Sequence, residues 1–218
     1  MINRQDCLDR LVSVMGNGAV KIITGIRRCG KSYLLNTIFR AYLKKQGVRN
    51  DHIVAVALDL DEFEELQNPR KLSVYVKKRL KSDGKTNYVF IDEIQLCYKV
   101  LKEGVKIEEV APEDRDSVWL TFYDVLNSLN AKPNVDIYVT GSNSKMLSKD
   151  VATNFRGRKT EIQLMPLSFA EFHGYRRGEK ADDWQEYLTF GGLPQVVLSA
   201  TEREKAATLN ELFGNLYL

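Results

Sequence analysis

The feature that most constrains the fold is a short apolar strand followed at once by a glycine-bounded loop and a helix. Val20–Thr24 is a β-branched run, and Gly25–Ser32 then reads G-x-x-x-x-G-K-S. From Lys31 to about Gln46 the apolar residues recur with a helical period, and Gly47 stands where a glycine would end the helix. This order of strand, loop and helix is typical of α/β sheets that bind phosphate groups.

The loop has the residues that an anion-binding site needs. Gly25 and Gly30 let the backbone curl so that successive N–H groups point at phosphate oxygens. The helix that follows adds its unsatisfied N–H groups and positive dipole end. Lys31 is expected to contact the β- and γ-phosphates, and the Ser32 hydroxyl to complete the coordination of Mg²⁺. The residues expected to bind the nucleotide are Gly25, Ile26, Arg27, Arg28, Cys29, Gly30, Lys31, Ser32 and Tyr33.

The rest of the chain alternates strands and helices. Helical patterns cover residues 5–15, 70–81, 118–130 and 202–217. Further strand patterns cover Ile53–Leu60, Tyr88–Ile91, Val135–Thr140 and Thr160–Leu167. Near-continuous apolar strands separated by helices indicate an α/β fold, a parallel P-loop sheet with helices on both faces and a short helical C-terminal part.

The domain organisation follows from length and from the C-terminal pattern. A chain of 218 residues allows one large domain, or one domain with part of a second. We expect residues 1–167 to form the P-loop domain and 168–218 to be a helical region that begins a truncated C-terminal domain. The apolar residues that suggest a missing covering segment are Leu212, Phe213, Leu216, Tyr217 and Leu218. The alternative is a native end that docks on its own core.

Two segments are rich in charge. Residues 97–118 carry a Gly, a Pro and little periodicity, which predicts a surface excursion or insertion. The basic stretch 70–81 can contact nucleic acid, or it can simply be a solvated helix face. The solvated face is favoured, because the net charge is only +3 and aromatic residues such as Tyr75 are sparse there.

Composition places the chain among globular cytoplasmic proteins. Apolar residues make up 44% and charged residues 28%, and no apolar run is long enough to span a bilayer. Cys7, Cys29 and Cys97 lack CxxC spacing, which favours reduced thiols, and we interpret Cys29 as a tolerated small residue rather than a redox thiol. His52 and His173 lie far apart in sequence, which argues against a histidine metal site.

Two further strands end in residues that suit the same chemistry. Tyr88–Ile91 leads into Asp92 and Glu93, at the strand end where ligands of open α/β sheets bind. Asp92 would hold Mg²⁺, directly or through water, and Glu93 could polarise a water for attack on the γ-phosphate. The polar run 140–144 follows a later strand and can reach the same crevice, although an ordinary capped turn would look similar.

Taken together, these residues resemble the AAA+ ATPases of the additional-strand P-loop class. Several phrases resemble one prokaryotic subgroup that often carries a C-terminal domain of uncharacterised function: VKIITGIRRCGKSYLL, FIDEIQ, VTGSNSKML, GR followed by IQLMPLSFAEF, and FGGLP. The resemblance runs from about Arg4 to Leu218. The charged segment 97–118 is longer than a minimal loop after the strand that ends in Asp92 and Glu93, and it can make a contact specific to the subgroup.

The resemblance implies roles for individual residues. Lys31 and Ser32 match the phosphate and magnesium positions, and Asp92 and Glu93 match the metal-holding acid and the catalytic base. Ser142 or Asn143 matches the sensor position after the fourth strand, and Gln95 stands in the phrase DEIQ without a clear role. Arg158 is a candidate arginine finger, with Arg156 as the alternative, and a solvated loop cation is an equal interpretation.

The sequence therefore predicts an ATP-binding protein that hydrolyses ATP to ADP and phosphate with Mg²⁺ and drives a conformational change in a partner or neighbour. A homo-oligomer or a protein partner fits this interpretation, a nucleic-acid partner has weak support, and no membrane partner is expected. Two alternatives are a nucleotide-gated binding module for protein or DNA with little turnover, and a P-loop kinase. Glu93 beside Asp92 and the polar residues Ser142 and Asn143 favour hydrolysis over the kinase.

Overall fold

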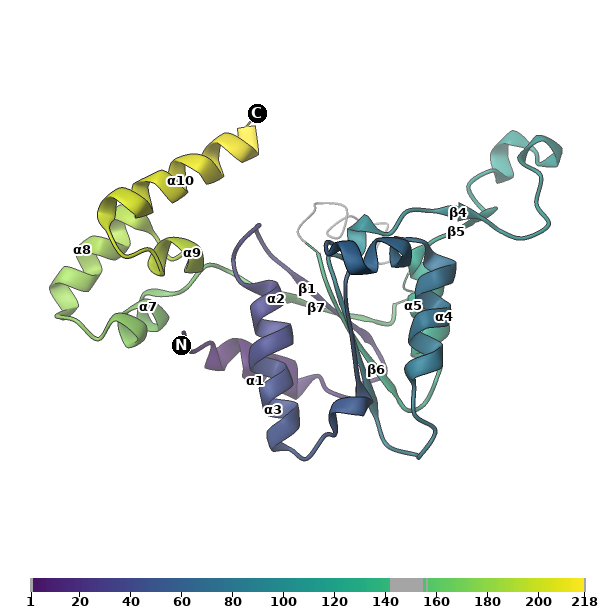
Figure 1. Ribbon diagram of the computed structural model, residues 1–218, viewed down its shortest axis with the longest axis horizontal. Coiled ribbons are helices and arrows are strands. Elements are labelled where there is room, and N and C mark those ends of the chain that lie inside the picture. Colours follow the sequence, from purple (N-terminus) through teal and green to yellow (C-terminus); the bar gives the residue numbers. More distant parts are fainter. Residues whose placement is uncertain (1, 142–154, 156, 218) are drawn as a thin grey trace.

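A five-stranded parallel sheet forms the centre of the computed structural model, which describes residues 2–141, 155 and 157–217 (Figure 1). The strand order is β2-β3-β6-β1-β7. The strands are β1 (Val20–Thr24), β2 (Ile53–Ala57), β3 (Asn87–Asp92), β6 (Val135–Thr140) and β7 (Lys159–Gln163). Because neighbouring strands all run parallel, their carboxyl ends meet at one edge of the sheet.

Helices cover both faces of this sheet. The α-helices are α1 (Gln5–Ser13), α2 (Lys31–Tyr33), α3 (Arg40–Lys45), α4 (Pro69–Arg79), α5 (Phe122–Asn130), α7 (Phe169–Arg176), α8 (Lys180–Phe190), α9 (Pro194–Val197) and α10 (Glu202–Tyr217). A π-helical stretch, Leu34–Phe39, joins α2 to α3, and short 3-10 helices cover Asn50–His52, Asp61–Gln67, Ile94–Leu96, Ile107–Glu109 and Pro112–Asp114. Helices α1 to α3 lie on one face and α4 and α5 on the other (Figure 1). The α/β fold expected from the sequence is confirmed.

Apolar clusters hold the helices against the sheet. On the α1–α3 face, the rings of Phe39, Phe90 and Tyr138 are fully buried, and the Phe39 and Tyr138 centroids lie 4.7 Å apart. On the other face, Leu72 and Val76 of α4 pack with buried residues of β2, β3 and α5. Both faces of the sheet are therefore buried at its centre, which explains why β2 and the middle of β3 are apolar without alternation, whereas the edge strand β7 is polar and only partly buried.

Some predicted boundaries are wrong. The strand expected over Ile53–Leu60 ends at Ala57, because the Leu60 N–H donates to the Ala57 carbonyl at 3.1 Å and turns the chain. The strand expected over Thr160–Leu167 is β7, which ends at Gln163. The helix expected over 118–130 begins only at Phe122.

The charged segment 97–118 is part of a projecting arm. Its base is a two-stranded antiparallel pair, β4 (Val100–Leu101) and β5 (Trp119–Leu120), which takes Trp119 and Leu120 out of the predicted helix. The arm extends away from the sheet on the side of α4 and α5 (Figure 1). The expected surface excursion is therefore present, with short 3-10 helices of its own and no buried residue in them.

The C-terminal helices gather around a separate small core. Leu167, Phe172 and Val197 are buried there, together with Ile2 from the start of the chain. On α10, Leu212 is buried, whereas Phe213 is 66% exposed. The side chains of Leu216, Tyr217 and Leu218, also named in the sequence argument, lie outside the described residues. The division at residue 167 and a truncated further domain stay predictions.

None of the described helices is long and apolar enough to cross a membrane.

A buried ion pair crosses the sheet between β1 and β6. Lys21 is completely buried and its ammonium contacts the Asp136 carboxylate. The other Asp136 oxygen accepts hydrogen bonds from the Gly16 N–H at 3.0 Å and the Tyr138 hydroxyl at 2.9 Å. This network joins the turn after α1 to two central strands, and a charge left alone in it would lack water to solvate it.

Because of that isolation, we expect Lys21→Met to lower the free energy of unfolding by about 3–5 kcal/mol, since it leaves the Asp136 carboxylate buried and unpaired. Adding Asp136→Asn removes the charge while keeping an acceptor for Tyr138, so the double variant should regain much of the loss. Urea unfolding of the two single variants and the double variant measures the coupling. Losses that simply add would contradict the assignment.

Candidate nucleotide-binding site

The glycine-bounded loop lies at the carboxyl edge of the sheet, between β1 and α2. Gly25 has a φ of 147°, and a Cβ placed on it would lie 2.2 Å from the Leu164 carbonyl oxygen and 2.9 Å from the Cys29 sulfur. Gly30, immediately before Lys31, has a φ of 96°. Both positions therefore require glycine, because any side chain would collide or be strained, and the loop can curl tightly only with these residues.

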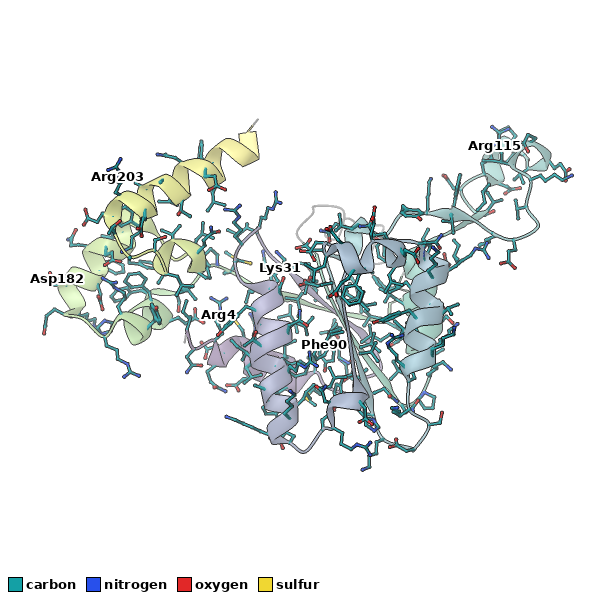
Figure 2. All side chains as sticks on the ribbon, in the orientation of Figure 1. Arg4, Lys31, Phe90, Arg115, Asp182 and Arg203 are labelled. Atoms are coloured by element: carbon teal, nitrogen blue, oxygen red, sulfur yellow. The ribbon has the colours of Figure 1, made fainter. Side chains whose placement is uncertain are left out.

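Lys31 is held inside the curve of this loop. Its ammonium donates hydrogen bonds to the carbonyl oxygens of Gly25 and Ile26, each at 3.1 Å. The residue is buried at the start of α2, where Figure 2 labels it. A flexible ammonium on two neutral carbonyl groups can turn to a phosphate at little cost, because a charged acceptor makes the stronger bond.

Ser32 and Asp92 meet at the same edge. The Ser32 hydroxyl lies close enough to the Asp92 carboxyl group at the end of β3 to lower the pKa of Asp92, although the two residues are sixty positions apart in sequence. The Thr140 hydroxyl at the end of β6 also donates to Asp92. Burial raises the pKa of Asp92, the hydrogen bonds from Thr140 and Ser32 oppose the rise, and the charges of Glu93 and Asp59 add to it.

Glu93 follows in an uncommon backbone conformation. Its φ of 52° and ψ of 47° are left-handed, which a non-glycine residue adopts only when its surroundings hold it there. The Glu93 N–H donates to the Thr140 hydroxyl at 3.0 Å, so the same hydroxyl contacts both acidic residues. Gln95, whose role the sequence left open, donates from its side-chain amide to the Glu93 carboxylate.

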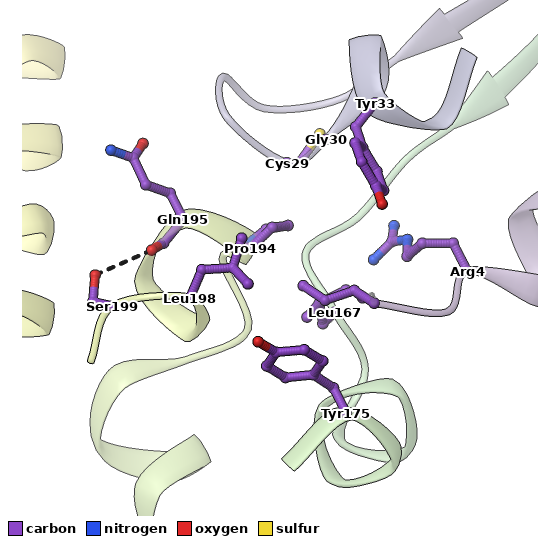
Figure 3. Close-up of a pocket in the computed structure, with 11 residues that line it drawn as sticks. Arg4, Cys29, Gly30, Tyr33, Leu167, Tyr175, Pro194, Gln195, Leu198 and Ser199 are labelled. Atoms are coloured by element: carbon purple, nitrogen blue, oxygen red, sulfur yellow. Dashed lines mark hydrogen bonds between the residues drawn. The ribbon is translucent and has the colours of Figure 1, made fainter. Parts of the chain in front are cut away.

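A cavity of about 470 Å³ adjoins the loop (Figure 3). It is formed by side chains from the N-terminal segment, from the loop and α2, and from the C-terminal helices. These residues are Ile2, Arg4, Cys29, Gly30, Tyr33, Leu167, Tyr175, Pro194, Gln195, Leu198 and Ser199. A largely apolar and aromatic cavity with a few polar groups is typical of sites that hold a small organic ligand.

Arg4 is fixed at the wall of this cavity. Its guanidinium donates to the Met165 carbonyl oxygen at 2.7 Å and pairs with the Glu171 carboxylate at 3.4 Å. Sequence reasoning missed Arg4, because nothing in the local pattern of residues 1–10 brings it near the loop. Pro194 lies in the phrase FGGLP, which in the sequence carries only a family resemblance, and it packs 3.8 Å from where a Cβ on Gly30 would lie.

The other predicted loop residues have different surroundings. Ile26 and Arg27 are exposed, and Tyr33 lines the cavity. Arg28 pairs with Glu211 of α10 at 3.2 Å, which joins the loop to the last helix. Burial raises the pKa of the Cys29 thiol, which agrees with a tolerated small residue rather than a reactive one.

Arg158 lies at the opposite edge of the sheet. Its carbonyl oxygen accepts a hydrogen bond from the Val20 N–H at 3.0 Å, at the start of β1. The loop begins where β1 ends, roughly 15 Å away at the usual rise per residue. Arg158 therefore cannot serve the loop of its own chain. Ser142, Asn143 and Arg156 lie outside the described residues.

The oxygen ligands at this edge suit a Mg²⁺ ion that is bound together with phosphates, rather than a metal ion held by protein side chains alone. Within the described part of the chain, no three His, Cys, Asp or Glu side chains gather to hold an ion. Ser32 and Asp92 offer one hydroxyl and one carboxylate. Mg²⁺ takes such a small set of hard oxygens when phosphates and water complete its coordination.

Comparison with known proteins identifies the family. The model of the AAA domain matches residues 17–173. The chain belongs to the AAA domain family. It is thus a nucleotide-binding P-loop protein of the ATP-binding AAA type, and the strand between β1 and β3 agrees with the predicted additional-strand class.

The relatives are longer proteins whose own roles are not named. An uncharacterized protein of Haemophilus influenzae is 30% identical over 223 residues, which is all of this chain and 50% of the relative. An uncharacterized protein of Methanocaldococcus jannaschii is 28% identical, over 91% of this chain and 41% of the relative. The chain thus spans about half the length of these curated relatives or less.

A solved structure supports the fold. The Walker-type ATPase of Pyrococcus abyssi is 16% identical, with a TM-score of 0.51, and the match covers 90% of this chain and 65% of that one. At this identity the likeness concerns the fold alone, and it agrees with the α/β fold described above.

The raised pKa of Asp92 leads to a prediction about stability. Folded Asp92 binds its proton more tightly than the unfolded chain does, so wild-type stability falls as pH rises from the ordinary value of 3.8 through the raised pKa. Asp92→Asn removes this penalty and should raise the free energy of unfolding at pH 7, with the advantage vanishing below about pH 4. Urea unfolding at both pH values measures it. Asp114→Asn, at an exposed position of the arm, is the control, and a destabilised Asp92→Asn protein at pH 7 would contradict the argument.

Proposed function

We propose that the protein is a Mg²⁺-dependent ATPase that cleaves the bond between the β- and γ-phosphates of ATP by attack of water. The observation that carries this proposal is the convergence of Lys31, Ser32 and Asp92 at one edge of the sheet, with the Ser32 hydroxyl near enough to Asp92 to lower its pKa. A cation, a hydroxyl and a carboxylate at the start of a helix suit a metal-bound triphosphate.

The loop and the cavity bind different parts of the nucleotide. The backbone N–H groups of the loop and the Lys31 ammonium bind the β- and γ-phosphates. The adenosine part occupies the adjoining cavity, where Tyr33 and Tyr175 offer aromatic surface and Gln195 offers polar groups. The preference for adenine is supported by the AAA family and by the lack of an Asn-Lys-x-Asp sequence for guanine.

Ser32 and Asp92 would hold Mg²⁺ in this reaction. The ion, when bound, neutralises charge on the phosphate oxygens. Asp92 must be ionised to hold it, and the hydrogen bonds from Thr140 and Ser32 favour that ionised form against burial.

Glu93 is the catalytic base. It accepts a proton from the attacking water while the water oxygen bonds to the γ-phosphorus and the bridging oxygen leaves with ADP. The Thr140 and Gln95 contacts hold the backbone and the carboxylate of Glu93 in place before the reaction. Ser142 or Asn143, which follow β6, would orient the water.

Arg158 acts on a neighbouring chain. Its place at the amino edge prevents contact with its own loop, so a finger role requires a second copy whose loop faces this edge. The arginine would then stabilise charge on the transferring phosphoryl group. The Arg28–Glu211 ion pair connects the loop to α10, and this contact supports a conformational response of the C-terminal helices to nucleotide.

The first test separates binding from hydrolysis. Lys31→Ala should abolish ATP binding, because the phosphates lose their only buried cation among the described residues of the loop. Glu93→Gln should bind ATP normally and release phosphate about 10²–10⁴ times more slowly than wild type, because it cannot accept the proton. Fluorescent-ATP titration and phosphate-release assays with Mg²⁺ measure these effects. Normal ATP binding by Lys31→Ala would refute the site.

The second test uses mixed assemblies. Arg158→Ala should bind ATP but lose about 10³-fold or more of its turnover. Mixing it with Glu93→Gln should restore activity, because a Glu93→Gln chain supplies Arg158 to an intact loop on its neighbour. Wild-type turnover should also rise with protein concentration. Arg115→Ala, at an exposed arginine of the arm, is the control, and mixtures no more active than the separate variants would contradict action in trans.

A further inference from the structure

A second cavity of about 420 Å³ lies along β2, the edge strand farthest from β7. Helix α3 and the segment before β2 form one wall. Helix α4 and Lys81, which follows it, form the other. The residues that form it are Arg40, Asp51, Ile53, Val54, Ala55, Tyr75, Lys78, Arg79 and Lys81. We call this the basic edge groove. It is separated from the loop strand β1 by β3 and β6.

The backbone of β2 is open toward this groove. The Leu58 N–H donates to the Asp92 carbonyl oxygen, so by alternation Val54 and Val56 also face β3 while Ile53, Ala55 and Ala57 face outward.

Two of the outward groups already have partners. The Ile53 N–H donates to Asn50, and the Ala57 carbonyl oxygen accepts from Leu60. Within the described residues, the Ala55 N–H and carbonyl, the Ile53 carbonyl and the Ala57 N–H have no backbone partner. This spacing is what one added strand needs.

The charge of the groove is strongly positive. Arg40, Lys78, Arg79 and Lys81 line it against one acid, Asp51, which already pairs with Arg49 at 2.5 Å. Lys78, Arg79 and Lys81 have no ion pair with any described residue. The Arg40 guanidinium donates a hydrogen bond to the Asn50 side chain at 2.8 Å, which holds this cation at the wall of the groove, and its Nε atom has no hydrogen-bond partner in the described part of the chain.

These cations do not simply guard the strand against aggregation. Guarding charges usually stand on the edge strand itself, whereas every side chain of β2 is apolar and the cations come from the segments that flank it. Charges on both sides of an open backbone would attract an acidic chain rather than repel an extended one.

We propose that the basic edge groove binds an extended acidic peptide segment of a partner protein, which adds to the sheet as a strand beside β2. The peptide backbone would pair with Ile53, Ala55 and Ala57, and its carboxylates would reach Arg40 on one side and Lys78 and Arg79 on the other. Main-chain bonds supply affinity in this mode of recognition, and the flanking side chains supply specificity.

Nucleic acid fits the groove less well. The Arg79 guanidinium covers one face of the Tyr75 ring, 3.5 Å from its centroid, and Phe63 also packs against that ring, so Tyr75 is poorly placed to stack on a base. Unpaired amide N–H and carbonyl groups in strand geometry match a peptide backbone, which has both groups at the same spacing. A phosphate backbone has no donor to offer to the carbonyl groups.

The test uses anisotropy at low salt and the peptide Thr-Glu-Glu-Val-Glu-Glu-Thr-amide, labelled with fluorescein at its N-terminus, whose Glu side chains lie on both faces of an extended strand. The acidic peptide should bind, a version with Lys in place of Glu should not, and N-methylation of alternate backbone amides should abolish binding. Lys78→Glu with Arg79→Glu should weaken binding about tenfold or more. Lys71→Glu with Lys77→Glu changes the charge of the same helix outside the groove and should alter binding less than about twofold.

A second measurement does not depend on variants. The peptide should slow hydrogen exchange at the Ala55 and Ala57 amides of the wild-type chain. Equal binding of the N-methylated peptide, unchanged exchange at Ala55, or preferred binding of single-stranded DNA to the same groove would each overturn the proposal. ATP binding should be the same in both double variants, so a failure here is distinct from a failure of the ATPase proposal.

Discussion

Parallel strand pairing is the constraint on which the rest of this structure depends. It brings the ends of β1, β3 and β6 to one edge, so that a loop, an acid pair and a hydroxyl from distant parts of the chain meet. Strand β6 both separates and connects the other two. Its last residue, Thr140, donates to Asp92 and accepts from the Glu93 N–H, so the neighbouring strand helps to fix the geometry of the acid pair.

The sequence predicted the parts of this site that depend on local order. The loop and Asp92 each follow a strand whose apolar run is visible in one short segment, and the sheet topology then requires them to meet. The cavity was not predictable in this way, because Arg4 and Pro194 reach it through packing of segments nearly two hundred residues apart. Lys21 shows the same limit. It lies in an apolar strand, and nothing near it in the sequence identifies its partner Asp136, which is 115 residues away.

The family role of Arg158 could be predicted from the sequence, but its place in the fold could not. The phrase around it resembles a family in which such an arginine acts on nucleotide. A phrase this short does not say at which edge of the sheet the arginine lies. The pairing of Val20 with Lys159 fixes that edge. A role for Arg158 in hydrolysis thus becomes a statement about assembly, because only another chain can offer it a loop.

Two features of the site cost free energy in the folded protein. Asp92 is buried with a raised pKa, and Glu93 keeps a left-handed backbone although it is not glycine. Such features persist when other contacts outweigh them, here the Thr140 hydroxyl and the packing of β3 between two strands. In the proposed reaction, a cation beside Asp92 would offset the cost of burying the ionised carboxylate. Nucleotide binding would then stabilise the whole sheet edge, since a ligand that prefers the folded state adds to its stability.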